Sequence, residues 1–216
     1  MASEPSLAEL ARTTVARARV ATVAYPRPGI EPGMRTVAMR ADHTGRPLLP
    51  SAGGSGPIWH RLLRAWVRVS VAAGPHFTAL TLTGTVQEYR ADDEPAYLVA
   101  PRTVCFTGPE RAPVPLPDYY ACAPDPLWHD APRMLHHLAA AHILEMLSCV
   151  RAHGLADAEW VSPRCLDRYG LELTALTPRG ATRVRLPFSN GPIGSLNDIP
   201  AAYRCVLTCR CRPGPP

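Results

Sequence analysis

The alternation of apolar and polar residues predicts β-strands through most of the N-terminal half of the chain. The clearest is residues 78–89, where Leu80, Leu82, Gly84 and Val86 alternate with threonines, so that one face is apolar and the other polar. Similar β-branched runs predict strands at 20–25, 35–41 and 67–73, and a short extended piece at 47–50.

Helices are predicted at residues 6–19, 58–66 and 92–99. In the first of these segments, apolar residues recur every three or four positions, and Ser6 with Glu9 forms a capping pattern at its start. A turn at 42–45 and a glycine-rich loop at 51–57 separate the predicted elements.

A proline-rich stretch at 109–132 indicates a domain junction, so we expect two domains, residues 1–125 and 126–216. The second begins with the longest predicted helix, 132–153, which Asp130 would cap and Gly154 would end. Strands are expected at 159–166, 171–177 and 182–188, and a last helix from Ser195 to about Arg210.

Charge and composition narrow the class of protein. The formal net charge is +5, and every basic side chain is arginine, which fits a GC-rich genome better than a selected nucleic-acid surface. The arginines are scattered and aromatic residues make up only 6%, so no basic stripe with interleaved aromatics is expected. The sequence has no apolar run of membrane-spanning length and no secretory signal, and we expect a cytoplasmic protein without nucleic-acid or membrane partners.

The seven cysteines do not form a recognisable framework. Their number is odd and their spacing irregular, and Cys205, Cys209 and Cys211 near the C-terminus match no usual zinc pattern. No motif for a hydrolase or a phosphate-binding loop is present.

Several strings resemble a known family. "ARTTVARARVATVAY", "MRTVAMRADHTGRPLLPS", "WVRVSVAA" and "ALTLTGTVQEY" follow one another as in split-barrel flavoproteins of the pyridoxamine-phosphate-oxidase type, and "EPAYLVAPRTVCF" resembles the helix that follows their long strand. "HHLAAAH", "CLDRYGLEL", "RVRLPF" and "DIPAAYRCVLTCR" resemble the small domain fused to HugZ-type barrels. The resemblance implies an α+β fold, a split β-barrel followed by a small α+β domain, with two barrels paired as a homodimer.

In that family the ligand in the dimer cleft is a flavin or haem, and the resemblance points to a first group of candidate residues. The string that follows the family's serine corresponds here to the loop after Ser51, but its asparagine is missing. His60, Arg61 and Arg64 would remain to contact a phosphate or the cleft, because guanidinium groups suit phosphate. The alternative is that these arginines are merely solvated.

The second group lies in the predicted helix 132–153. The family's His-Met-Asn-x-Asp-His string appears as His137-Leu-Ala-Ala-Ala-His142, which keeps both histidines and loses both other polar groups. His142 falls within the helix's apolar stripe. It is either a core histidine with a protein hydrogen-bond partner or a ligand of haem iron.

Three functions remain open from the sequence. The first is a HugZ-type haem-binding protein that degrades or senses haem. The second is an oxidoreductase that uses FMN or a deazaflavin. The third is a regulatory or interaction module that has lost its ligand.

Overall fold

The structure is a computed structural model that describes residues 4–29, 31–51, 56–73, 77–91, 94–188 and 191–198. It divides into two compact units, of which one spans Ser6–Pro124 and the other begins at Asp125.

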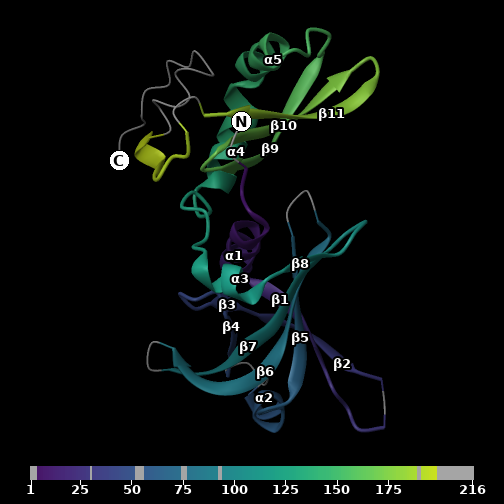
Figure 1. Cartoon of the computed structure of the whole chain (residues 1–216), viewed down its shortest axis with the longest axis vertical. Helices are drawn as coiled ribbons and strands as arrows, with labels where there is room; N and C mark the ends of the chain where they lie inside the picture. Colours follow the sequence, from purple (N-terminus) through teal and green to yellow (C-terminus); the bar gives the residue numbers. More distant parts are fainter. Residues whose placement is uncertain are drawn as a thin grey trace. The chain divides into compact units, whose positions relative to one another are not determined.

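The N-terminal unit is built on one curled antiparallel sheet (Figure 1). The order of its strands among the described residues is β2-β1-β5-β6-β7-β4-β3, and β8 also pairs with β7. The strands are β1 (Val20–Tyr25), β2 (Gly33–Ala38), β3 (Arg40–Ala41), β4 (Pro47–Pro50), β5 (Trp66–Ala72), β6 (Ala79–Ala91), β7 (Glu94–Thr107) and β8 (Ala112–Val114). The helices are α1 (Leu7–Arg17), α2 (Gly56–Arg61) and α3 (Leu116–Ala121).

Period-two patterning creates the interior of this sheet. Val67, Val69 and Val71 of β5 are buried, and they lie beside Leu80 and Leu82 of β6 in the paired register. Side chains from the other strands and helices complete the same core, among them Val15, Val23, Leu49, Trp59, Val99, Phe106 and Tyr119. The polar face that the sequence predicts for β6 points away from this core.

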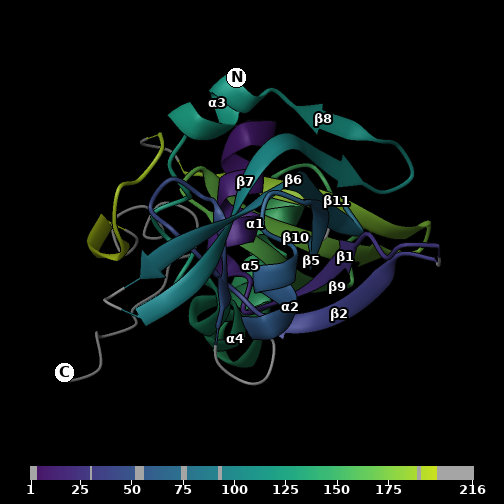
Figure 2. The ribbon, with the colours of Figure 1, turned by 90° about the horizontal axis from the view of Figure 1, so that it is seen from below.

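The two longest strands, β6 and β7, form a ribbon that bends across the unit, with β8 along the C-terminal part of β7 (Figure 2). Their register shifts between Thr83 and Gly84. A Cβ atom at Gly84 would lie 2.0 Å from the carbonyl oxygen of Ala100, so only glycine fits this close approach of the two backbones.

The helix predicted at 92–99 is wrong, because residues 94–107 form β7. The segment contains Pro95 and Pro101, which are poorly tolerated inside a helix, and the long β6 offers it a complete partner strand. Pairing with the rest of the sheet therefore outweighs the local helical spacing. The helix that the family resemblance implied for this segment is wrong for the same reason.

Two further boundaries differ from the predictions. The helix expected at 58–66 covers only Gly56–Arg61, and Trp66 already belongs to β5, because the chain turns at Arg64 with a φ of 64°. The strand expected at 35–41 is divided at Met39, whose backbone N–H donates to the carbonyl of Arg19.

The unit that begins at Asp125 combines an antiparallel sheet in the order β11-β10-β9 with helices that pack on β9 (Figure 1). Its described elements are α4 (Ala131–Ala141), α5 (Ile143–Ala152), β9 (Trp160–Asp167), β10 (Gly170–Thr177), β11 (Gly180–Pro187) and the 3-10 turn η1 (Leu196–Asp198). Leu138, Met146, Val150, Leu171 and Leu173 are buried in its core. None of the described helices is long and apolar enough to cross a membrane.

The turn between β9 and β10 is held by buried carboxylates. Asp167 accepts hydrogen bonds from the backbone N–H groups of Tyr169 and Gly170 and pairs with the guanidinium of Arg185. Asp125 accepts from the N–H groups of Leu127 and Arg168 at 2.7 Å each. These charges are buried with their partners, as such groups must be for the fold to be stable.

The predicted continuous helix 132–153 is interrupted. Helix α4 ends at Ala141, His142 has φ −131° and ψ 24°, and α5 starts at Ile143. The sequence has neither proline nor glycine at this position, so it contains no local signal for the break. Of the last predicted helix, only the turn Leu196–Asp198 is described, and Arg210 lies outside the described residues.

We expect Gly84→Ala to destabilise the protein by about 1–3 kcal/mol, as overpacking does, because the added methyl group meets the backbone of β7. Chemical denaturation would measure the change in the free energy of unfolding. Gly108→Ala is the matched control, since its Cβ would lie at an ordinary contact distance of 3.6 Å from Phe77. Equal stabilities of the two variants would contradict the close approach at Gly84.

Candidate functional site

A pocket of about 310 Å3 opens in the N-terminal unit where β2, β3, β4 and β7 meet. Its walls are mostly apolar, and two exposed arginines border it. The lining residues are Arg19, Ala38, Met39, Arg40, Leu48, Leu49, Pro50 and Ala96. This volume is at the lower end of the range for small-molecule sites, about 300–1,000 Å3.

Strand pairing brings these residues together from distant parts of the sequence. Arg40 lies opposite Leu48 in the β3–β4 ladder, and Pro50 lies opposite Ala96 in the β4–β7 ladder. The hydrogen bond from Met39 N–H to Arg19 C=O extends the β1–β2 ladder, so Arg19 reaches the same place. Met39 and Leu49 are almost completely buried and form the apolar floor.

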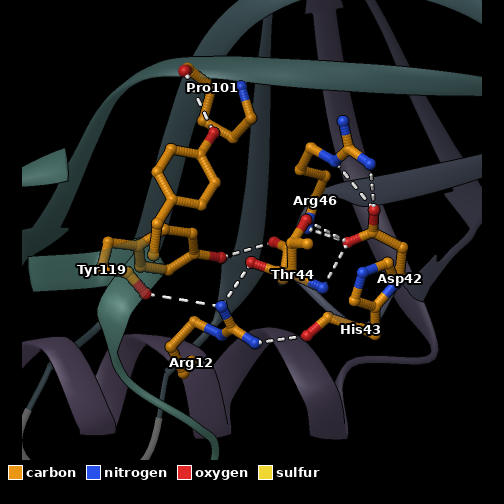
Figure 3. Close-up of polar contacts among 9 residues, drawn as sticks. Arg12, Asp42, His43, Thr44, Arg46, Pro101 and Tyr119 are labelled. Atoms are coloured by element: carbon orange, nitrogen blue, oxygen red, sulfur yellow. Dashed lines mark hydrogen bonds and ion pairs between the residues drawn. The ribbon is translucent and has the colours of Figure 1, made fainter. Parts of the chain in front are cut away.

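The turn between β3 and β4 is fixed by the carboxylate of Asp42 (Figure 3). Its Oδ1 accepts from the backbone N–H groups of Thr44 and Arg46 and from the Thr44 hydroxyl, at 2.8–2.9 Å. Its Oδ2 accepts from the Arg46 guanidinium at 2.7 and 2.8 Å. Burial raises the pKa of Asp42, but these hydrogen bonds and the charge of Arg46 outweigh it and hold the pKa below its ordinary value of 3.8.

The same turn is anchored to α1 by a buried arginine. Arg12 is 4% exposed, and its guanidinium donates to the carbonyl oxygens of His43, Thr44 and Tyr119 (Figure 3). The Tyr119 hydroxyl donates to the carbonyl of Gly45, whose φ of 85° and lack of a side chain leave room for Arg12. Burial raises the pKa of the Tyr119 phenol, which therefore stays protonated and remains a donor. Helices α1 and α3 thereby position β3 and β4, two of the four strands that line the pocket.

The barrel residues expected to bind a cofactor are scattered around α2 rather than gathered in this pocket. Ser51 directly follows the pocket residue Pro50, and its hydroxyl donates to the carbonyl of Pro95 at 2.6 Å. His60 is exposed and lies 3.5 Å from Glu88. Arg61 and Arg64 are exposed, and Arg64 has a left-handed backbone whose N–H donates to Val86 C=O.

The two histidines expected to bind a cofactor lie together in the other unit. His142 is 6% exposed and His137 is exposed, and their Nε2 atoms are 3.2 Å apart. The rings meet edge to face, with centroids 5.0 Å apart. No cluster of three or more potential metal ligands occurs among the described residues.

Sequence reasoning missed the two arginines that border the pocket. Arg19 and Arg40 are 21 positions apart. Arg19 directly precedes β1 and Arg40 begins β3, so no motif links them. Only the antiparallel pairing of β1 with β2 connects them. A sequence signal for them would have required knowledge of that register.

The Asp42 turn leads to a prediction about stability. Asp42→Asn removes the charge that pairs with Arg46 and one of the acceptors at the turn, so we expect a loss on the order of 1–3 kcal/mol at neutral pH. Because the folded pKa of Asp42 is lowered, its contribution is complete above 3.8 and is lost as the pH falls through the folded value.

Denaturation curves of wild type and Asp42→Asn should therefore differ at neutral pH and converge in acid. Glu110→Gln, which neutralises an exposed carboxylate of the same unit, is the control. A stability difference that persists unchanged into acid would show that the Asp42 charge is not responsible.

Comparison with known proteins relates the fold to solved structures. No protein-family model matches the sequence, and no curated protein matches it. The heme binding protein from Mycobacterium smegmatis superposes with a TM-score of 0.68 at 22% identity, covering 94% of this chain and 97% of that one. The Agrobacterium tumefaciens protein Atu2129, of unknown function, covers 92% of this chain at 15% identity with a TM-score of 0.40. The predicted α+β fold, a split barrel followed by a small α+β unit, is confirmed by the likeness to the Mycobacterium smegmatis protein.

Proposed function

We propose that this chain is a haem-binding protein of the HugZ type, which degrades or senses haem. The observation that carries the proposal is the apolar pocket of the split barrel with Arg19 and Arg40 at its border. The resemblance of the C-terminal strings to the HugZ-type small domain supports it, as does the shared fold with a protein described as heme-binding.

The chemistry of the pocket fits the ligand class. Haem is a flat apolar macrocycle that carries two propionate groups at one edge. Met39, Leu49 and Ala96 offer apolar contact, and arginines form charge-assisted hydrogen bonds with carboxylates. The pocket is small for a whole macrocycle, so we propose that it holds the propionate edge and leaves the remainder outside.

The iron ligand is proposed separately from the pocket, because His142 belongs to the other unit. His142 remains the residue that the sequence favours, but its ring is buried and its Nε2 faces His137. An iron atom would reach His142 Nε2 only after the His137 ring turned away. The His142→Ala variant therefore tests the ligand independently of the pocket.

A flavin is the second candidate, and a specific observation favours it. Arg61 and Arg64 are both exposed and three positions apart, next to the loop that follows Ser51. Guanidinium groups suit the phosphate of FMN or of a deazaflavin. Such a cofactor would supply the redox chemistry of an oxidoreductase, and the protein would supply binding and orientation.

The proposal includes a homodimer formed through the barrel. The outer face of β2–β1–β5–β6 is composed mainly of small and hydroxyl side chains, and Val20, Met34 and Trp66 are 60%, 72% and 56% exposed there. A second copy related by two-fold symmetry would cover this face and close the assembly. The buried area should exceed about 1,000 Å2.

Titration with haemin tests the ligand. We expect a shifted Soret band for wild type and a roughly tenfold weaker affinity for Arg40→Ala, since a charge-assisted hydrogen bond contributes about 1.5–3 kcal/mol. Arg35→Ala is the matched control, because Arg35 is exposed on β2 and does not line the pocket. A Soret shift lost in His142→Ala alone would assign the iron ligand.

The other outcomes decide between the candidates. Absence of any Soret shift in wild type would reject haem. Tight binding of FMN or a deazaflavin, weakened by Arg61→Ala or Arg64→Ala, would favour the oxidoreductase. Failure to bind any of the three, together with a stable dimer, would favour the interaction module.

Light scattering at micromolar concentration tests the dimer. We expect twice the monomer mass for wild type and the monomer mass for Thr22→Arg, since Thr22 is exposed near the centre of the outer face, between Thr36 and Ser70. Thr182→Arg on β11 is the control and should leave the mass unchanged. A monomeric wild type would reject the dimer.

A further inference from the structure

The break between α4 and α5 creates an arrangement that an unbroken helix would not allow. His137 and His142 are five positions apart, which would separate their side chains by about 140° around a regular helix. The structure instead brings their Nε2 atoms to 3.2 Å, because His142 leaves the helical conformation, with φ −131° and ψ 24°. The non-helical backbone at His142 therefore places two imidazole nitrogens next to each other.

The distance between these nitrogens is close to the distance between two ligands of one metal ion. Zinc binds imidazole nitrogen at about 2.0–2.1 Å with tetrahedral geometry, so two ligands of one ion lie about 3.3 Å apart. The observed 3.2 Å matches this separation, and it also matches a hydrogen bond between the rings. A metal ion would take the place of the proton that the two nitrogens share.

A carboxylate supports the orientation of the buried ring. Glu145 Oε1 lies 3.6 Å from Nδ1 of His142, just beyond hydrogen-bond distance, so its effect on the ring is that of a nearby negative charge. A carboxylate near Nδ1 favours the tautomer that carries its proton there, so that Nε2 presents a lone pair. Histidines that bind metals commonly have such a carboxylate at their other nitrogen.

We propose that His137 and His142 chelate a divalent transition-metal ion through their Nε2 atoms, with Glu145 orienting His142. The site has two protein ligands, and no third potential ligand joins them among the described residues, so water or an external ligand completes the coordination. Such a site is open and exchangeable. Its affinity should follow the order Cu²⁺, then Ni²⁺ and Zn²⁺, then Mn²⁺, and exclude Mg²⁺, which prefers oxygen ligands.

This inference does not rest on haem binding. Haem iron offers protein ligands only the two positions above and below the macrocycle plane. Two nitrogens 3.2 Å apart cannot occupy these opposite positions, so the paired geometry suits a free ion rather than haem. The metal site stands if haem does not bind, and haem binding in the barrel pocket stands if the metal site fails. At His142 itself the two ligands would exclude each other, because both would use its Nε2 atom.

Calorimetric titration with Zn²⁺ and with Ni²⁺ tests the proposal on the full chain with any affinity tag removed. The background carries Cys205→Ser, Cys209→Ser and Cys211→Ser, because thiolates bind the same ions and these residues lie outside the described part of the structure. We expect one ion per chain. His137→Ala should weaken binding at least tenfold and Glu145→Gln about tenfold.

His136→Ala is the matched control, because His136 is an exposed neighbour outside the pair, and it should bind like the parent. His137 is also exposed, so its variant should fold even if His142→Ala does not. NMR of the imidazole nitrogens should show metal-dependent shifts at Nε2 of His137 and His142. Absence of binding up to millimolar metal, or equal affinity of His137→Ala and His136→Ala, would overturn the proposal.

Discussion

One buried guanidinium organises the part of the barrel that forms the pocket. Arg12 on α1 donates to carbonyl oxygens of the β3–β4 turn and of α3, and Asp42 closes the same turn from inside. A buried cation is costly without acceptors, and the two Nη groups of Arg12 find theirs in the carbonyls of this turn and of Tyr119, whereas its Nε has no hydrogen-bond partner among the described residues. The turn must therefore present these carbonyls in one arrangement. That arrangement sets the strands on either side of the turn, and with them Arg40 and the apolar floor of the pocket.

The sequence predicts the fold well where the alternation of apolar and polar residues is the dominant pattern. Strands β1, β5 and β6 have alternating burial, and their predicted positions are close to the observed ones. The prediction was wrong for β7, because its residues 94–99 also fit a helix and only the neighbouring β6 selects the strand. Although β6 and β7 form a hairpin, the residues of β7 taken by themselves do not show that a partner strand precedes them.

The residues of the candidate sites were harder to predict from the sequence than the strands were. Arg19 and Arg40 belong to the pocket through strand register, which local patterns do not specify. The sequence did single out His137 and His142, but a regular helix would have directed them to different faces. Their contact depends on a non-helical backbone conformation at His142, and no proline or glycine at this position predicts it.

The position of β7 within the sheet also bears on how the chain folds during synthesis. This strand pairs with β4 and β6, which precede it, and with β8, which follows it. The hairpins β1–β2 and β5–β6 can form as soon as they leave the ribosome, whereas β4 has no partner on its β7 side until residue 98 has been made. Non-local pairings of this kind form slowly because the intervening chain must first be ordered. The nascent barrel therefore stays open, with an unpaired strand edge, until nearly half of the 216-residue sequence has been translated.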